Sequence, residues 1–257
     1  MSDEFDHYDG GDEPRYGSPE NIEQFKIREA LSNLHLLGDD HFLQMQAFNL
    51  SIVDQFIMGV EYDVLRLLIH EERTPVPEAS FLSAQSQMWI FAAYELMRTW
   101  RQRCNDMIKW QVNHGLELKL KSLTEDSGYK HFGKSMRASQ IQSVIDNPSL
   151  IQQIRDDLRR THILFARLEA IRISLAKHEL RGRDNSVALT PGYGRINQWC
   201  GSLDYELENG QYSMGYVNRR DIADEIRALF SYDELPTDEQ ITMFEDFLRG
   251  PPASPFD

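Results

Sequence analysis

PSLIQQIRDDLRRTHILFARLEAIRISLAKHEL, residues 148–180, is the stretch that decides the fold. Apolar residues recur along it every three or four positions, and a proline stands at its start, where the first turn of a helix tolerates one. This spacing predicts one long helix whose apolar stripe faces a core. The stripe consists of Ile151, Ile154, Leu158, Phe165, Leu168 and Leu175, with Arg172 in the position that the repeat leaves open.

Two further segments have the same helical spacing. Residues 41–72 and 77–113 each carry an apolar stripe, and the second includes Trp89 and Trp100. Another helix is predicted over residues 20–37, because Pro19 suits a first turn and Gly38 suits a helix end. Four long helices with short connections are typical of an antiparallel bundle.

The pattern changes towards the C-terminus. Residues 203–207 alternate apolar and acidic side chains, and Asn209-Gly210 favours a tight turn into residues 212–217, so a β-hairpin is predicted. Short helices are predicted from Asn218 to about residue 230 and over 236–249. The fold class is therefore mainly α: an antiparallel helical bundle with a small C-terminal β-hairpin and short helices.

Composition divides the chain into four expected segments. Residues 1–19 are rich in acidic residues, Gly and Pro, and such a composition favours a disordered tail. Residues 20–182 form the helical bundle domain. Residues 183–250 form a hairpin-plus-helix appendage, and residues 251–257 form a flexible tail.

The net charge of the chain argues against one class of function, non-specific binding of nucleic acid. The 257 residues carry a net charge of −14, and the first 20 contain seven acidic groups against one arginine. An acidic surface argues against non-specific coating of nucleic acid, which depends on Lys and Arg.

Two cysteines without a CxxC motif indicate neither a disulfide framework nor a zinc site. With no signal peptide or membrane-spanning stretch recognisable, we expect a cytoplasmic protein that does not bind membranes.

Basic residues collect near the end of the long predicted helix. Residues 155–183 hold eight Lys and Arg side chains against four acidic ones. Such a local excess of positive charge attracts phosphate. Arg172 and His178 lie within it with five residues between them, and Lys177 and Arg167 are close enough in sequence to assist in phosphate binding.

This arrangement resembles the HEPN superfamily, in which an Arg and a His separated by four to six residues lie late in a core helix of a bundle. The resemblance covers roughly residues 40–180. It implies a dimeric, metal-independent ribonuclease that needs no cofactor, with Arg172 and His178 as catalytic residues and RNA as substrate.

The two residue types suit that chemistry. A histidine with a pKa near 6.5 can accept or donate a proton at the ribose 2′-hydroxyl or the leaving oxygen. An arginine can hold the scissile phosphate with two parallel hydrogen bonds. Six positions along a helix turn the side chains by about 240°, so Arg172 and His178 leave different faces. A homodimer would bring them together across its two-fold axis.

The alternative is a non-catalytic helical protein that interacts with other proteins or has a structural role. Lys177 and His178 would then complement the C-terminal dipole of the helix. Arg172 would pair with Glu169 or with Glu95, the only charged residue in 88–97 and hence expected to be at least partly buried. The acidic tail or the hairpin would contact the partner protein.

Two further clusters receive a structural interpretation. Residues 191–195, Pro-Gly-Tyr-Gly-Arg, offer glycines and a cation to an anion but lack the phosphate-loop pattern, so a turn before the hairpin is expected. His35, Asp39, Asp40 and His41 lie near one another in sequence, but the aspartates suit a helix cap. No metal site is therefore expected.

Overall fold

The structure is a computed structural model that describes residues 16–17, 19–125, 128, 131–176, 194–208 and 213–250. It is mainly α with one small antiparallel sheet, as the sequence predicts. The elements in chain order are a 3-10 helix at Pro19–Asn21, α1 (Lys26–Ser32), α2 (His41–Glu71), α3 (Val76–Val112), α4 (Leu116–Thr124), α5 (Phe132–Asp146), α6 (Leu150–Arg160), α7 (His162–Ala176), β1 (Gly194–Ile196), β2 (Leu203–Glu208), β3 (Ser213–Asn218), α8 (Arg219–Arg227) and α9 (Asp238–Arg249).

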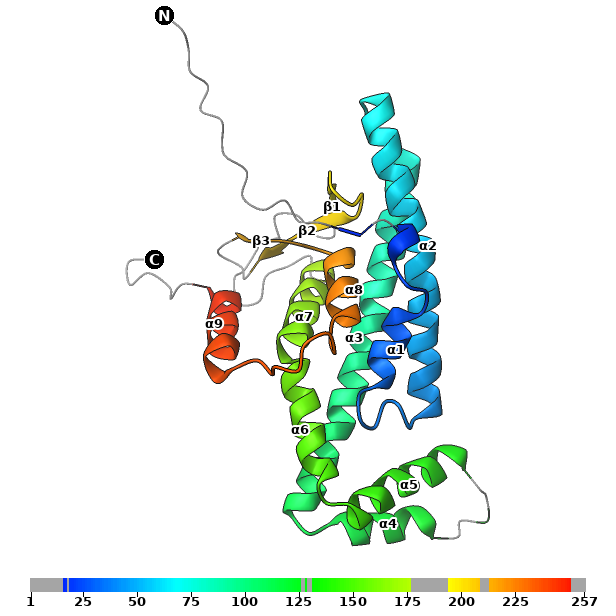
Figure 1. Cartoon of the computed structure of the whole chain (residues 1–257), viewed down its shortest axis with the longest axis vertical. Helices are drawn as coiled ribbons and strands as arrows, with labels where there is room; N and C mark the ends of the chain where they lie inside the picture. The colour runs from blue at the N-terminus through cyan, green and yellow to red at the C-terminus, as the bar shows by residue number, and fades with distance from the viewer. Residues whose placement is uncertain are drawn as a thin grey trace, which may run out of the picture.

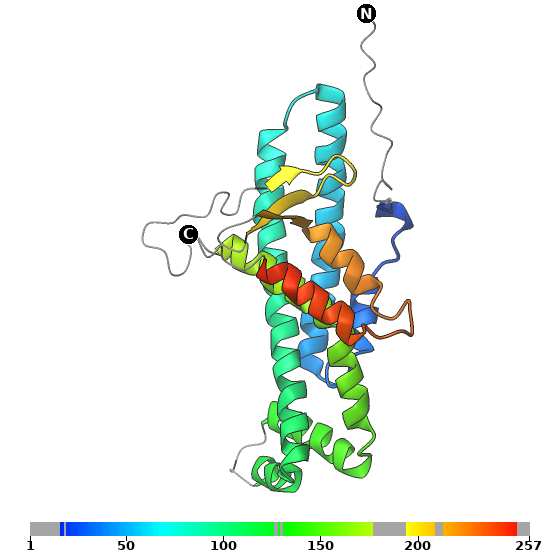
Figure 2. The same ribbon diagram turned by 90° about the vertical axis from the view of Figure 1, so that its left-hand side faces the viewer.

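The long hairpin of α2 and α3 is the frame of the molecule (Figure 1). Both helices have nearly the predicted bounds and run antiparallel. α1 packs against α2, whereas α6 and α7 pack against α3. Trp89 and Trp100 of α3 are almost completely buried, and burial of such large side chains is a major source of stability in a core. Viewed at right angles, α7 and α9 cross in front of this hairpin (Figure 2).

The segment before α2 is not the long helix predicted over residues 20–37. α1 covers only Lys26–Ser32, and the chain continues in turns to residue 39. Leu36 has a positive φ of 66°, which no helix contains. These turns bury Leu34, Leu36 and Leu37 against the core, and their burial outweighs the continuation of the helix.

The long helix predicted over residues 148–180 is two helices, α6 and α7, which meet at Thr161. The Thr161 hydroxyl is buried, donates to the carbonyl of Asp157 and accepts a hydrogen bond from Arg101. A threonine that bonds back to the preceding turn weakens a helix locally. Residues 177–193, which include the predicted end of this helix, lie outside the described residues.

The predicted hairpin is present as β2 and β3, and β1 adds a third antiparallel strand on the other side of β2. The sequence predicted a turn there. Gly194 lies opposite Tyr205, and a Cβ at this position would come within 2.7 Å of the Cβ of Leu203. A glycine is therefore required where β1 meets the sheet.

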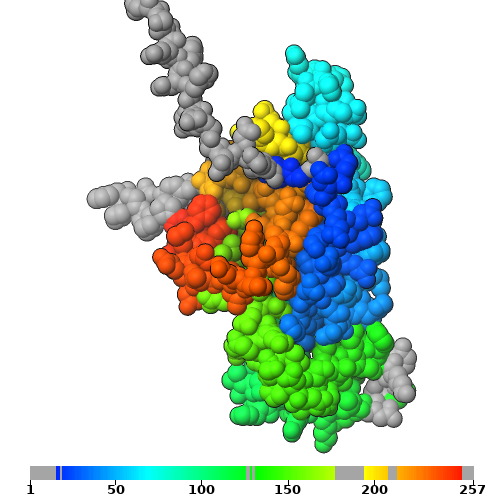
Figure 3. Space-filling model, viewed as in Figure 1, coloured from blue at the N-terminus to red at the C-terminus, as the bar shows by residue number. Residues whose placement is uncertain are grey.

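The elements after α7 share the core of the helices. Leu203, Tyr205, Ile222 and Ile226 are buried in the same cluster as Trp89. α9 differs because it buries no residue completely, and it lies as a separate ridge on the surface (Figure 3). The boundary expected at residues 182 and 183, together with residues 1–15 and 251–257, falls outside the described residues. None of the helices described is both long enough and apolar enough to cross a membrane.

Candidate functional site

Arg172 does not occupy the core stripe of α7. Ile171 takes that position with no exposed surface, and Arg172 is half-buried beside it. The guanidinium carbon of Arg172 lies 5.2 Å from the centre of the Tyr94 ring. Within the described part of the chain, neither Glu95 nor Glu169 forms an ion pair with Arg172. The expected pairing is therefore replaced by a cation–π contact, worth about 0.5–1 kcal/mol at an accessible site.

That contact belongs to a stack of four side chains between α3 and α7. The Tyr94 ring lies 5.7 Å from the Phe165 ring and nearly parallel to it, and the guanidinium carbon of Arg101 lies 4.7 Å from the centre of the Phe165 ring. The Tyr94 hydroxyl donates to Glu169 at 3.2 Å, and burial together with this carboxylate raises the pKa of Tyr94. The hydrogen bond to Glu169 thus orients the Tyr94 ring, over which the Arg172 guanidinium lies.

Arg167, predicted to assist phosphate binding, already has two partners on other helices. It forms an ion pair with Glu225 of α8, and its guanidinium carbon lies 5.5 Å from the Phe244 ring of α9. Burial lowers its pKa. The side chain therefore joins α7 to α8 and α9, and its charge is compensated within the chain.

Glu95 is exposed, contrary to the sequence expectation. Its neighbours Ala93, Leu96 and Met97 take the buried positions of α3, so Glu95 points outward. It pairs with Arg98 one turn later at 2.7 Å. An exposed pair of this kind contributes little to stability.

The other predicted site residues are distributed over the molecule. Lys177, His178 and residues 191–193 lie outside the described residues. Arg195 of β1 lies over the Tyr216 ring at 5.6 Å. Asp40 caps α2 as predicted, since its carboxylate accepts hydrogen bonds from the backbone of Phe42 and Leu43.

His35 forms a hydrogen bond with a carboxylate of α6. Its Nδ1 lies 2.7 Å from a carboxylate oxygen of Asp157, and this hydrogen bond raises the pKa of His35. In the described ranges, no group of three or more His, Cys, Asp or Glu side chains is arranged to hold a metal ion.

The strongest electrostatic feature is a buried cluster that joins α2 to α8. The Arg219 guanidinium donates two hydrogen bonds to Glu61, at 2.8 and 2.7 Å, and a third to Asp54. Arg227 also donates to Asp54, and Arg219 lies 5.4 Å from the Trp89 ring. Burial alone would lower the pKa of Arg219, but the two carboxylates outweigh it and the pKa is raised.

Sequence reasoning missed this cluster. Its signal was present, because Asp54 and Glu61 are seven residues apart and fall on the apolar side of the α2 stripe. Two acidic side chains on a core face require cations from elsewhere in the chain. Each nitrogen of the Arg219 guanidinium donates to one of these carboxylates, and the side chain is completely buried, so the cluster fits a structural role.

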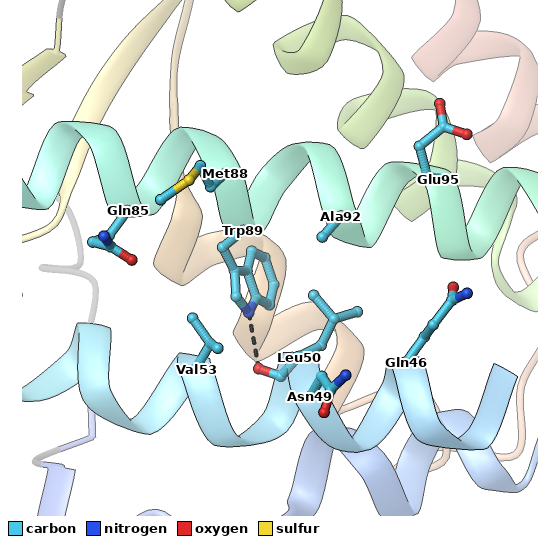
Figure 4. Close-up of a pocket in the computed structure, with 9 residues that line it drawn as sticks. All are labelled: Gln46, Asn49, Leu50, Val53, Gln85, Met88, Trp89, Ala92 and Glu95. Carbon is cyan, nitrogen blue, oxygen red and sulfur yellow. Dashed lines mark hydrogen bonds between the residues drawn. The ribbon is translucent and has the colours of Figure 1, made fainter. Parts of the chain in front are cut away.

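Beside the cluster, the outer face of the hairpin is hollowed into a groove between α2 and α3 (Figure 4). Its volume is about 390 Å³. Leu50 and Trp89 are buried at its floor, where the Trp89 indole donates to the Leu50 carbonyl at 3.0 Å. The residues lining it are mostly apolar or uncharged: Gln46, Asn49, Leu50, Val53, Gln85, Met88, Trp89, Ala92 and Glu95.

The surface around the groove is unusually poor in charge. Between Phe42 and Val60 the only Asp, Glu, Lys or Arg is Asp54, which faces the core, and α3 has none from residue 79 to 94. Val53 and Met88 are 37% and 56% exposed. Phe56 lies three residues after Val53, and Phe81 lies four residues before Gln85, so helical spacing extends this apolar surface to both rings. We call the groove with these two residues the groove face.

Comparison of the chain with family models, with curated proteins and with solved structures yields no match.

Proposed function

We propose that this chain is a non-catalytic helical interaction protein that binds another protein chain through the groove face. The observation that carries the proposal is the combination of a preformed groove with exposed apolar walls and no lysine or arginine along it. Exposed apolar patches of this kind mark sites of protein association. A nucleic-acid-binding face, by contrast, would need cations.

The contacts of the predicted catalytic region agree with a structural role. Arg172 and Arg101 flank the stacked rings of Tyr94 and Phe165, and Arg167 is paired with Glu225. These contacts join α3, α7 and α8. These side chains thus stabilise the packing of the helices that support the groove face.

Site-specific photo-crosslinking in cells tests the proposal. A benzophenone amino acid placed at Asn49, on the rim of the groove, should give a discrete crosslinked adduct. The same amino acid at Leu118, which is 77% exposed on α4, serves as the control and should give none. Absence of any adduct at position 49, with the protein folded and expressed, would contradict an interaction through this face.

A metal-independent ribonuclease of the HEPN type is the second candidate. One observation favours it: Arg172 has no ion-pair partner in the described part of the chain, so its guanidinium retains donors for a phosphate. His178 would move the proton and Lys177 would assist phosphate binding, with RNA as substrate and a homodimer as the active form.

Cleavage of single-stranded and structured RNA in EDTA tests this candidate. The activity should be lost in Arg172→Ala and His178→Ala. Arg172→Lys keeps the charge but not the planar fork, so it should retain only part of the activity. A wild-type chain that cleaves no RNA while dimeric would remove the candidate.

A further inference from the structure

We infer that the groove face binds a second copy of this chain, with Phe56 of each copy inserted into the groove of the other. The inference rests on the proposed function and names its partner. It follows from three properties of the face: its self-complementary shape, its lack of charge and its area.

A two-fold interface needs a projection and a hollow on the same surface, displaced from each other. The groove face has both. Phe56 is 75% exposed and lies six residues beyond Leu50 on the groove floor, which is about 9 Å along the helix at about 1.5 Å per residue. Phe81, 54% exposed on α3, lies beyond the same end of the groove, because α3 runs in the opposite direction.

These positions define the pairing. A two-fold axis that crosses the two helices midway between the groove and Phe56 places each Phe56 over the opposite groove. The two hairpins then run antiparallel face to face and together make a four-helix bundle, an arrangement in which helices commonly pack. Val53 and Met88, which form the groove walls, would contact the inserted ring.

The charge distribution selects a second copy over a charged partner. Two chains that each carry −14 repel one another in general, and a surface without acidic groups is where such chains can approach closely. The groove face meets this condition over residues 42–60 and 79–94. Glu95, at one end of the groove, already pairs with Arg98.

The exposed apolar area of the groove face limits the affinity of the dimer. Val53, Phe56, Phe81 and Met88 are between 37% and 75% exposed, and at about 150–250 Å² for each large side chain they present roughly 400 Å². This is about half of the ~800 Å² that each partner contributes to a standard interface, before the small and polar rim residues are counted. A dimer of moderate affinity is therefore expected.

Sedimentation equilibrium of the purified full-length chain tests the inference. The wild type should be dimeric at micromolar concentration, and the dimer should persist at high salt because its interface lacks ion pairs. Phe56→Glu should raise the dissociation constant at least 100-fold with an unchanged circular dichroism spectrum, since Phe56 is exposed. Leu118→Glu, a matched exposed position, should leave it unchanged. A monomeric wild type, or a dimer that Phe56→Glu does not weaken, would overturn the inference.

Mixed crosslinking locates the contact. Tagged and untagged Val53→Cys chains, once mixed, should give a tagged–untagged product with a short bis-maleimide, because Val53 lies midway between Leu50 and Phe56, where the two-fold axis crosses α2, and Phe56 stays in place. Both natural cysteines are buried and do not compete. A dimer without this product would also overturn the inference. A monomer that gives an adduct of another mass in the photo-crosslinking experiment would leave the proposed function standing; a monomer without an adduct would remove both.

Discussion

The last two helices of the described chain start alike and end up in opposite environments. α8 and α9 each begin with a capping box, formed by Asn218 with Asp221 and by Thr237 with Gln240. α8 buries five of its residues in the core, whereas α9 buries none. Local signals thus define where a helix begins, but the side chains that it offers to the rest of the chain decide how firmly it is held.

The contacts of α9 are peripheral. Arg159 pairs with Asp238 at 2.7 Å, His162 lies 2.8 Å from Glu245, and Arg167 lies over the Phe244 ring. Accessible pairs of this kind contribute about 0–1 kcal/mol each. α8 instead supplies Arg219, the cation that compensates two buried carboxylates.

Loss of the ion pairs between α8 and α2 should destabilise the chain most. Arg219→Met leaves Asp54 and Glu61 without their main partner, and the free energy of unfolding should fall by about 3–5 kcal/mol. Urea denaturation measures it. The triple variant with Asp54→Leu and Glu61→Leu should recover part of the loss, because the two buried carboxylates are gone and Arg220 and Arg227 keep Asp224 as a partner. A loss below about 1 kcal/mol in the single variant would contradict the central role of the cluster.

Removal of the N-cap should affect global stability in α8 and only local stability in α9. Asn218→Ala should lower the global free energy of unfolding by about 1–2 kcal/mol, since α8 unfolds only with the core. Thr237→Ala should release α9 alone, so amide exchange should rise in residues 238–249 with little change in global stability. Equal global losses in the two variants would show that both helices belong to one cooperative unit.

Deletion of α9 should have a smaller effect. A chain that ends after Glu234 keeps the Tyr232 carbonyl that Arg160 binds at 2.8 Å. It loses the three peripheral contacts and the hydrogen bond from Arg159 to the Pro236 carbonyl. We expect a loss of about 1–2 kcal/mol and an unchanged core, as measured by urea denaturation and tryptophan fluorescence. Failure of the shortened chain to fold would show that α9 is an essential part of the core.

The pH dependence of stability should differ slightly between the two capping boxes, because only the box of α8 contains a carboxylate that titrates. Burial raises the pKa of Asp221, whose carboxylate accepts from Tyr16 at 2.7 Å, whereas Gln240 does not titrate. Because the folded chain holds this proton more tightly than the unfolded chain does, the contribution of Asp221 is greatest below its unfolded pKa of about 3.9. It falls as pH rises through the folded pKa.

The stability of the wild type relative to Asp221→Asn should therefore decrease as pH rises from about 4 through the folded pKa, and then level off once Asp221 is ionised in both states. Denaturation series of both chains across this range measure the difference. Gln240→Ala is the control and should leave the pH profile unchanged. A difference that grows with pH would mean that the fold favours the charged carboxylate.

Periodicity was sufficient to predict the elements with strong local patterns. The bounds of α2, α3 and the β2–β3 hairpin follow from stripes, turn residues and alternation. The prediction was wrong where contacts with distant residues decide the local structure. Thr161 accepts a hydrogen bond from Arg101, and Gly194 packs against Leu203. The turn at Leu36 buries its leucines against the core.

The candidate site shows the same limit. Glu95 was expected to be buried because its neighbours in sequence are apolar, but the rotation of the helix directs its side chain outward. In the same way, Ile171 takes the buried position that was expected for Arg172. The roles of Lys177 and His178 stay predictions. The groove face could not be predicted, because its two walls belong to different helices whose rotation is fixed only when the core packs.

The buried cluster also constrains how the protein is made. Arg219 follows Glu61 by 158 residues and Asp54 by 165. At about 5–20 residues per second, a ribosome needs roughly 8–30 s to synthesise that interval. Until then, the hairpin of α2 and α3 carries two carboxylates on the side that it must bury. A nascent chain interrupted before α8 therefore cannot complete its core, so the folded core forms only after α8 has been synthesised.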